Sequence, residues 1–143
     1  MKAEAKKVLE RAREAGWLME PDARALLDLY GLPMGRHAFV RNEDEAVIAA
    51  AMIGYPVVMK VVSPKIVHKT DVGGVEVGIG GQDAMLAAFL RMKKLPGFRG
   101  VLLDRMLSGI EIFVGSRVDG QFGPVVLAGI GGTEYLIELI RLV

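Results

Sequence analysis

Residues 54–79 read GYPVVMKVVSPKIVHKTDVGGVEVGI and contain the most informative pattern in this chain. Residues 56–62 form a β-branched run that is typical of a strand buried on both faces. Residues 75–79 alternate between apolar and other side chains, which predicts a half-buried strand. The polar segment between them, residues 63–74, ends in two glycines. This stretch therefore predicts two strands joined by a polar loop that carries candidate functional groups.

The segments around this stretch add helices and further strands. Apolar spacing and capping residues predict helices over 2–15, from about Pro21 to Tyr30, from Asn42 to Gly54, and from Asp83 to Lys94. Strands are predicted over 37–40, 100–106, 110–118 and 124–130, and Asp119-Gly120 favours a hairpin between the last two. The final ten residues, EYLIELIRLV, return to helical spacing. The chain is thus predicted to contain both helices and strands.

Composition excludes several classes of protein. The 143 residues are 52% hydrophobic and 24% charged, which argues against a disordered tail. A net charge of +1 gives no general attraction to nucleic acid or to an anionic membrane. The absence of cysteine excludes a disulfide framework, a thiolate nucleophile and a cysteine-based metal site. With no secretory h-region and no long apolar segment, the expected location is cytoplasmic.

Lys60 interrupts an apolar strand and is the first candidate functional residue. A buried ammonium group without a partner is costly, so a lysine at this place needs an anionic neighbour. The residues leave two interpretations open. Lys60 either faces water from an edge strand or binds phosphate at a cleft.

The loop after this strand carries the second group of candidates. His68 is one of two histidines in the chain, and a histidine can take and release a phosphoryl group or a proton near neutral pH. Asp71 can orient its ring by accepting a ring N–H, and Lys69 adds positive charge. Gly73 and Gly74 allow backbone N–H groups to approach an anion closely. The alternative is an ordinary solvated loop in which the histidine is incidental.

A second glycine cluster, GIGGT at residues 129–133, directly follows a predicted strand. Gly131 and Gly132 are candidates for a second phosphate-facing loop. The spacing matches neither G-x-G-x-x-G nor the P-loop pattern, so by itself it identifies no nucleotide-binding class.

Residues 54–79 resemble the central motif of the ATP-grasp domain of ADP-forming acyl-CoA synthetases, the acetate–CoA ligase family. The beta subunit of that family reads G-Y-P-V-V-x-K and then S-P-x-x-x-H-K-[ST]-D-x-G-G-V. Residues 20–34 resemble the family's entry helix with its Y-G-[IL]-P stop. Residues 100–132 resemble its strand pair and its Q-F-G-P hairpin. The resemblance spans about residues 17–132.

The resemblance implies a role for each matching residue. Lys60 would contact the ATP phosphates, and His68 occupies the position of the family's mobile, phosphoryl-accepting histidine. Gly73 and Gly74 would lie over the phosphates. The remaining residues of the implied nucleotide site are Lys69, Asp71, Asp104, Gly131 and Gly132. At Asp104-Arg105 the family usually has a Gln-Glu pair that meets adenine, so this contact is expected to be altered.

The implied activity is that of the nucleotide-binding subunit of an ADP-forming acid–thiol ligase. In the family, an acyl phosphate forms on a CoA-binding alpha subunit, and its phosphoryl group passes through an alpha histidine and a beta histidine to ADP. The resemblance implies Mg²⁺ at the nucleotide and an α2β2 heterotetramer; the residues identify no metal ligands. The alternatives are a non-catalytic ligand-binding module of a protein acetyltransferase and an inactive remnant.

The implied architecture is an ATP-grasp domain with two small α+β lobes. We expect an N-terminal helix over 1–19, a partial ATP-grasp domain over 20–132 and a C-terminal helix over 133–143. Because Met1 precedes the domain's own helices, a stand-alone beta subunit is expected. Several dozen residues of the family pattern are expected to be missing between Thr133 and Glu134.

Overall fold

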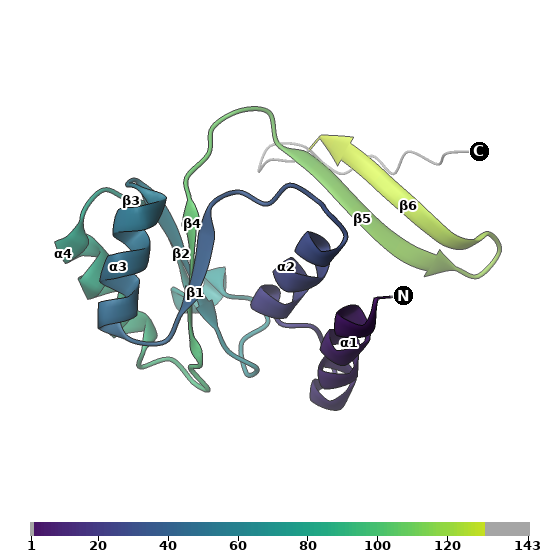
Figure 1. The fold of residues 1–143 in the computed structure, drawn as a ribbon, viewed down its shortest axis with the longest axis horizontal. Helices are drawn as coiled ribbons and strands as arrows, with labels where there is room; N and C mark the ends of the chain where they lie inside the picture. Colours follow the sequence, from purple (N-terminus) through teal and green to yellow (C-terminus); the bar gives the residue numbers. More distant parts are fainter. Residues whose placement is uncertain (1, 131–143) are drawn as a thin grey trace. The chain divides into compact units, whose positions relative to one another are not determined.

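The computed structural model of the 143-residue chain describes residues 2–130, and they form an α+β fold, as predicted (Figure 1). The chain divides into two compact units, Met1–Met106 and Leu107–Val143. The first unit contains α1 (Ala3–Ala15), α2 (Glu20–Leu29), β1 (His37–Val40), α3 (Glu43–Ile53), β2 (Val57–Val62), the 3₁₀ turn η1 (Thr70–Val72), β3 (Val75–Ile79), α4 (Gln82–Met92) and β4 (Gly100–Arg105). The second contains β5 (Ile112–Asp119) and β6 (Gly123–Ile130).

The first unit is built on an antiparallel sheet with the order β1-β4-β2-β3. The strand that carries Lys60 is therefore an inner strand, with β4 on one side and β3 on the other. This placement excludes the interpretation that Lys60 faces water from an edge strand. Helices α3 and α4 lie on one side of the sheet and α2 on the other (Figure 1).

Strand alternation divides the side chains of β2 between these two faces. Val57, Met59 and Val61 point into the core beneath α3 and α4, where Phe89 and Leu103 are also fully buried. The intervening residues of β2 face α2. The sheet therefore has one apolar face that stabilises the unit and one face that carries charged residues.

Local signals in the sequence set the ends of several helices. Asn42 caps α3, as predicted, since its Oδ1 accepts a hydrogen bond from the Glu45 N–H at 2.9 Å. Gly16 ends α1 with a φ of 81°, the left-handed conformation that favours glycine. The cap of α4 differs from the prediction by two residues, because Gly81 occupies the cap position and Asp83 lies inside the first turn.

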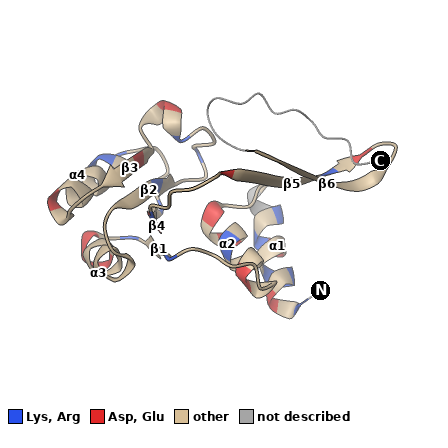
Figure 2. Cartoon of the chain, turned by 90° about the horizontal axis from the view of Figure 1, so that it is seen from above, with Lys and Arg blue, Asp and Glu red and all other residues tan. Residues whose placement is uncertain are grey.

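The second unit contains the predicted hairpin of β5 and β6. Asp119 pairs with Gly123, and its Oδ1 accepts hydrogen bonds from the N–H groups of Gln121 (2.9 Å) and Phe122 (3.2 Å). These bonds satisfy two backbone N–H groups of the turn, and Gly123 supplies the positive φ that the turn requires. Figure 2 shows that most residues of β5 and β6 are uncharged, whereas α1 and α2 carry many charges.

No helix among residues 2–130 has the length and apolar character needed to cross a bilayer. The predicted helix at 133–143 and the expected break between Thr133 and Glu134 lie outside the described residues. The domain boundaries expected from the resemblance stay predictions.

Candidate functional site

The candidate site lies where α2 meets the charged face of the sheet. The Lys60 ammonium is 3.0 Å from Glu20 Oε1 and 3.4 Å from Asp104 Oδ2. Glu20 is the first residue of α2, and Asp104 lies on β4, which pairs directly with β2. The Lys60 side chain is 30% exposed. This half-buried lysine therefore has the expected anionic neighbour twice, in Glu20 and in Asp104.

Two further cations complete this group. Lys69 Nζ lies 2.5 Å from Glu20 Oε2, so the loop after β2 is tied to α2. The Arg24 guanidinium contacts Asp104 at 2.7 Å and Glu20 at 3.2 Å. We call these five residues (Glu20, Arg24, Lys60, Lys69 and Asp104) the Lys60 cluster. With three cations and two carboxylates, the cluster has a net charge of +1, which favours an anionic ligand.

Glu20 is at the centre of the Lys60 cluster. Burial by itself raises the pKa of the Glu20 carboxyl. Hydrogen bonds from Lys69 and Lys60, together with the attraction of the same two ammonium groups, outweigh burial and lower the pKa from 4.5 to about 2. Glu20 is therefore ionised at neutral pH and holds the two lysines in place.

Substitution Glu20→Gln should destabilise the protein in a pH-dependent way. Because the folded-state pKa is lower than the unfolded one, the carboxylate stabilises the fold above about pH 4.5, and this contribution disappears as the pH falls toward 2. We expect the free energy of unfolding at pH 7 to fall by about 2–3 kcal/mol in the variant. Urea unfolding between pH 7 and pH 2 measures the difference.

The matched control for this prediction is Glu10→Gln. Glu10 forms an exposed pair with Lys6 at 3.9 Å, so this variant should change stability by less than about 0.5 kcal/mol at any pH. An equal effect of the two substitutions, or a Glu20→Gln effect that does not shrink in acid, would contradict the pairing described here.

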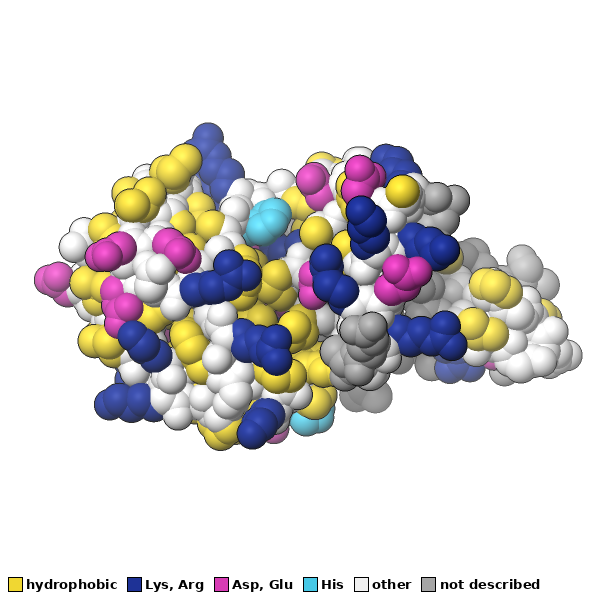
Figure 3. All heavy atoms as spheres, turned by 60° about the horizontal axis from the view of Figure 1, so that its bottom comes forward, with side chains coloured by type: hydrophobic (Ala, Val, Ile, Leu, Met, Phe, Trp, Pro, Cys, Tyr) yellow, Lys and Arg dark blue, Asp and Glu magenta, His cyan; other side chains and the backbone are white. Residues whose placement is uncertain are grey.

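His68 lies in the loop between two anchored residues. Ile66 is buried against the core, and Lys69 is held by Glu20. The His68 side chain itself is exposed, and both histidines are visible on the face shown in Figure 3. Within residues 2–130, no hydrogen bond joins its ring to Asp71, so the expected orienting contact does not form here. The ring is instead open to an external group.

The two glycines at the end of the loop have different structural roles. Gly73 has a φ of 67°, which favours glycine, and its N–H donates to the Thr70 carbonyl at 3.2 Å. The Gly74 N–H donates to the Lys69 carbonyl at 2.7 Å, and its own carbonyl accepts from the Val61 N–H at 2.8 Å. Both N–H groups are therefore engaged inside the loop. Their predicted contact with phosphate requires these bonds to open and stays a prediction.

Substitution Gly74→Ala should destabilise the protein by about 1–3 kcal/mol. A Cβ atom at this position would lie 2.6 Å from Val61 Cγ1 and 2.9 Å from the Lys69 carbonyl oxygen, so β2 or the loop must shift. Thermal unfolding of the two proteins measures the effect. Gly80→Ala is the control, because a Cβ there meets nothing within 4 Å. Equal melting temperatures for the Gly74 variant and the native protein would show that the loop adapts freely.

The remaining predicted residues fall in different places. Asp104 belongs to the Lys60 cluster, where its carboxylate forms ion pairs with Arg24 and Lys60. Gly131 and Gly132 lie outside the described residues. The part of the chain that the structure describes contains no group of three or more acidic or histidine residues able to hold a metal ion.

Sequence reasoning missed Glu20 and Arg24. Both lie on α2, four residues apart, so they face the same side of that helix. The signal that could have found them was the requirement of Lys60 for an anionic neighbour. That requirement did not say which of the 17 acidic residues would meet it.

Comparison with known proteins identifies the family of this chain. The ATP-grasp domain family matches residues 8–141, and the chain belongs to that family. It is 43% identical over 148 residues to the beta subunit of acetate–CoA ligase (ADP-forming) I of Pyrococcus furiosus, covering 97% of this chain and 63% of the relative. It is 39% identical to the 4-hydroxybutyrate–CoA ligase (ADP-forming) of Nitrosopumilus maritimus, covering 92% of this chain and 20% of that protein. The chain thus spans less than two thirds of each of these relatives.

Solved structures support the same relationship. A Pyrococcus horikoshii protein matches with a TM-score of 0.83 and 35% identity, covering 92% of this chain and 60% of that one. An acetyl-coenzyme A synthetase of Candidatus Korarchaeum cryptofilum matches with a TM-score of 0.72 and 34% identity, covering 90% of this chain and 57% of that one. The latter was solved with coenzyme A and Mg-AMPPCP, with its phosphohistidine segment pointing towards the nucleotide-binding site.

Proposed function

We propose that this chain is the nucleotide-binding part of an ADP-forming acyl-CoA ligase of the acetate–CoA ligase type and that His68 carries a phosphoryl group to and from the nucleotide. The observation that supports this most is the position of His68. Its exposed ring directly precedes Lys69, which is itself held in the Lys60 cluster. A nucleophile that must meet two separate reactants needs an accessible ring on a loop whose neighbouring residue is held in place.

Lys60 and Lys69 would bind the nucleotide phosphates. Phosphoryl transfer depends mainly on positioning and on positive charge that neutralises the phosphate oxygens. Each lysine has three N–H donors; Lys60 contacts two carboxylates and Lys69 contacts one. The excess positive charge of the Lys60 cluster therefore supports a phosphate group beside both lysines. Glu20 and Asp104 keep the ammonium groups in place before the nucleotide arrives.

In the proposed transfer, a neutral ring nitrogen of His68 attacks the γ-phosphorus of ATP. An N–P bond forms, the bond from phosphorus to the bridging oxygen breaks, and ADP leaves with that oxygen. In the reverse direction ADP attacks phosphohistidine. An exposed ring is suited to this chemistry because an external group can reach it.

The proposal includes a CoA-binding alpha subunit as partner, an α2β2 assembly, Mg²⁺ with the nucleotide, and a cytoplasmic location. Mg²⁺ is usually held by phosphates and one or two carboxylates. The carboxylates of the Lys60 cluster are already paired with cations, and residues 2–130 offer no cluster that fits a resident metal. We therefore assign no metal ligand to this part of the chain.

The experiment that tests the function combines the chain with the CoA-binding alpha subunit of an ADP-forming acetate–CoA ligase. Acetyl-CoA, ADP, phosphate and Mg²⁺ are supplied, and ATP formation is measured. We expect ATP only when both subunits are present. Nucleotide binding to the chain without turnover would instead identify the non-catalytic module, and absence of both would identify an inactive remnant.

A further inference from the structure

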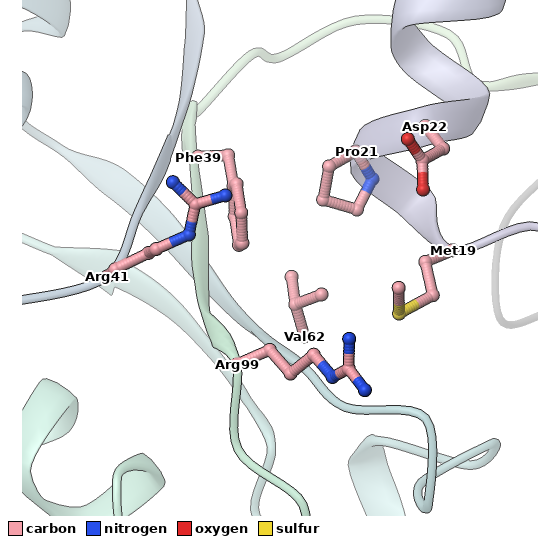
Figure 4. A pocket seen from close by; sticks show the side chains of 7 residues that line it. All are labelled: Met19, Pro21, Asp22, Phe39, Arg41, Val62 and Arg99. Atoms are coloured by element: carbon pink, nitrogen blue, oxygen red, sulfur yellow. The ribbon is translucent and has the colours of Figure 1, made fainter. Parts of the chain in front are cut away.

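A cavity of about 420 Å³ lies on the α2 side of the sheet. Its lining comes from the start of α2 and from the ends of three strands, and consists of Met19, Pro21, Asp22, Phe39, Arg41, Val62 and Arg99 (Figure 4). None of these residues belongs to the Lys60 cluster. Cavities of 300–1,000 Å³ are typical of small-molecule sites.

Two arginines make this cavity electropositive. In Figure 4, Arg99 extends beneath Val62 toward Met19, and Arg41 lies beside Phe39, across the cavity from Pro21. Among residues 2–130, neither guanidinium pairs with a carboxylate. The two positive charges are therefore available to an anion, and the planar fork of arginine favours bidentate binding of phosphate.

A backbone hydrogen bond positions the main chain of Arg99, and an aromatic ring lies against the guanidinium of Arg41. The Arg99 N–H donates to the Val62 carbonyl at 2.9 Å, which places the start of β4 against the end of β2. The Arg41 guanidinium lies over the Phe39 ring, 4.9 Å from its centroid. A stacked guanidinium has less freedom to lose when it binds a ligand.

The rest of the lining is apolar except for Asp22. Met19, Pro21, Phe39 and Val62 supply a surface for a hydrophobic group. Asp22 contacts Arg11 at 3.1 Å, and Arg11 does not line the cavity, so the one carboxylate here is already compensated. The net effect is an apolar wall with two cations at its edge.

From this arrangement we propose that the cavity binds a phosphate monoester whose organic part is apolar or flat, at a site separate from the Lys60 cluster. The phosphate accepts hydrogen bonds from Arg41 and Arg99, and the organic group packs on the apolar wall. Bare phosphate would leave the wall uncovered, and a neutral organic molecule would leave both guanidinium groups without a partner.

The test is calorimetric titration of the full chain with phenyl phosphate, isopentyl phosphate, inorganic phosphate and phenol. We expect at least one ester to bind about tenfold more tightly than either phosphate or phenol. Tighter binding of phenyl phosphate identifies a flat organic group, and tighter binding of isopentyl phosphate a branched aliphatic one. If neither ester binds more tightly than inorganic phosphate, this titration of the native chain alone overturns the proposal.

Variants locate the binding. Arg41→Met and Arg99→Met should each weaken ester binding about tenfold or more, while circular dichroism confirms that they are folded. Arg91→Met, an arginine change on α4 on the opposite side of the sheet, should leave it unchanged. Lys60→Met should also retain ester binding. Loss of binding in Lys60→Met but not in the Arg41 and Arg99 variants would place the ligand in the Lys60 cluster and overturn the proposal.

Discussion

Replacement of His68 by alanine should reduce acid-labile labelling of the protein to background. The assay incubates the chain and its alpha partner with ATP labelled at the γ-phosphate and measures acid-labile, base-stable phosphate on this chain. The expected loss is complete because alanine has no nucleophilic atom to form the N–P bond. The effect follows from the exposed position of His68 and from the role proposed for it.

The matched control is His37→Ala. His37 is half-buried on β1, and its Nδ1 lies 2.8 Å from the Gly35 carbonyl oxygen, which is a structural contact. This variant should keep full labelling. Unchanged labelling in His68→Ala would disprove the phosphoryl-carrier proposal, whereas nucleotide binding by that variant would still be expected.

Lys60→Met should have the second largest effect, and it should act on both ligand binding and stability. Removal of the ammonium group takes away one of the two cations proposed to bind phosphate, so affinity for ADP should fall about tenfold to a hundredfold. It also leaves Glu20 and Asp104 with one fewer partner in a half-buried place. We expect the free energy of unfolding to fall by about 1–3 kcal/mol.

Two comparisons separate these effects. Lys60→Arg keeps the positive charge and should recover much of the stability, although its planar fork does not reproduce the ammonium geometry. Lys94→Met removes an exposed lysine that follows α4 and should change neither quantity. Titration calorimetry with ADP and urea unfolding are the measurements. If Lys60→Met binds ADP as tightly as the native protein does, Lys60 does not belong to the nucleotide site.

Much of the fold could be predicted from local patterns. The β-branched run around Lys60 became β2, Asn42 became the cap of α3, and the Asp119-Gly120 signal became the turn of the β5–β6 hairpin. These features are signalled by residues close together in the chain, even where, as in β2, the strand then pairs with a distant segment. The small error at α4 arose because Gly81 and Asp83 are both acceptable near a helix start.

The candidate site was predicted less completely. Lys60 and Lys69 were identified, but their shared partner Glu20 lies 40 and 49 residues away in sequence, on a different element. Asp71 was expected beside the His68 ring because the two are three residues apart. Sequence proximity did not produce that contact, since the loop turns into η1 at Thr70 and holds Lys69 toward α2 instead.

Local sequence patterns were enough to show that Lys60 interrupts a buried strand and that a histidine, two lysines and two glycines follow it in one loop. They also showed that such a lysine needs an anion. Only the tertiary structure decided that β2 is an inner strand, that Glu20 joins both lysines, and that Arg41 and Arg99 face one cavity. The physical reason is that hydrophobic periodicity specifies which side of an element is buried, whereas ion pairs depend on which elements pack against one another.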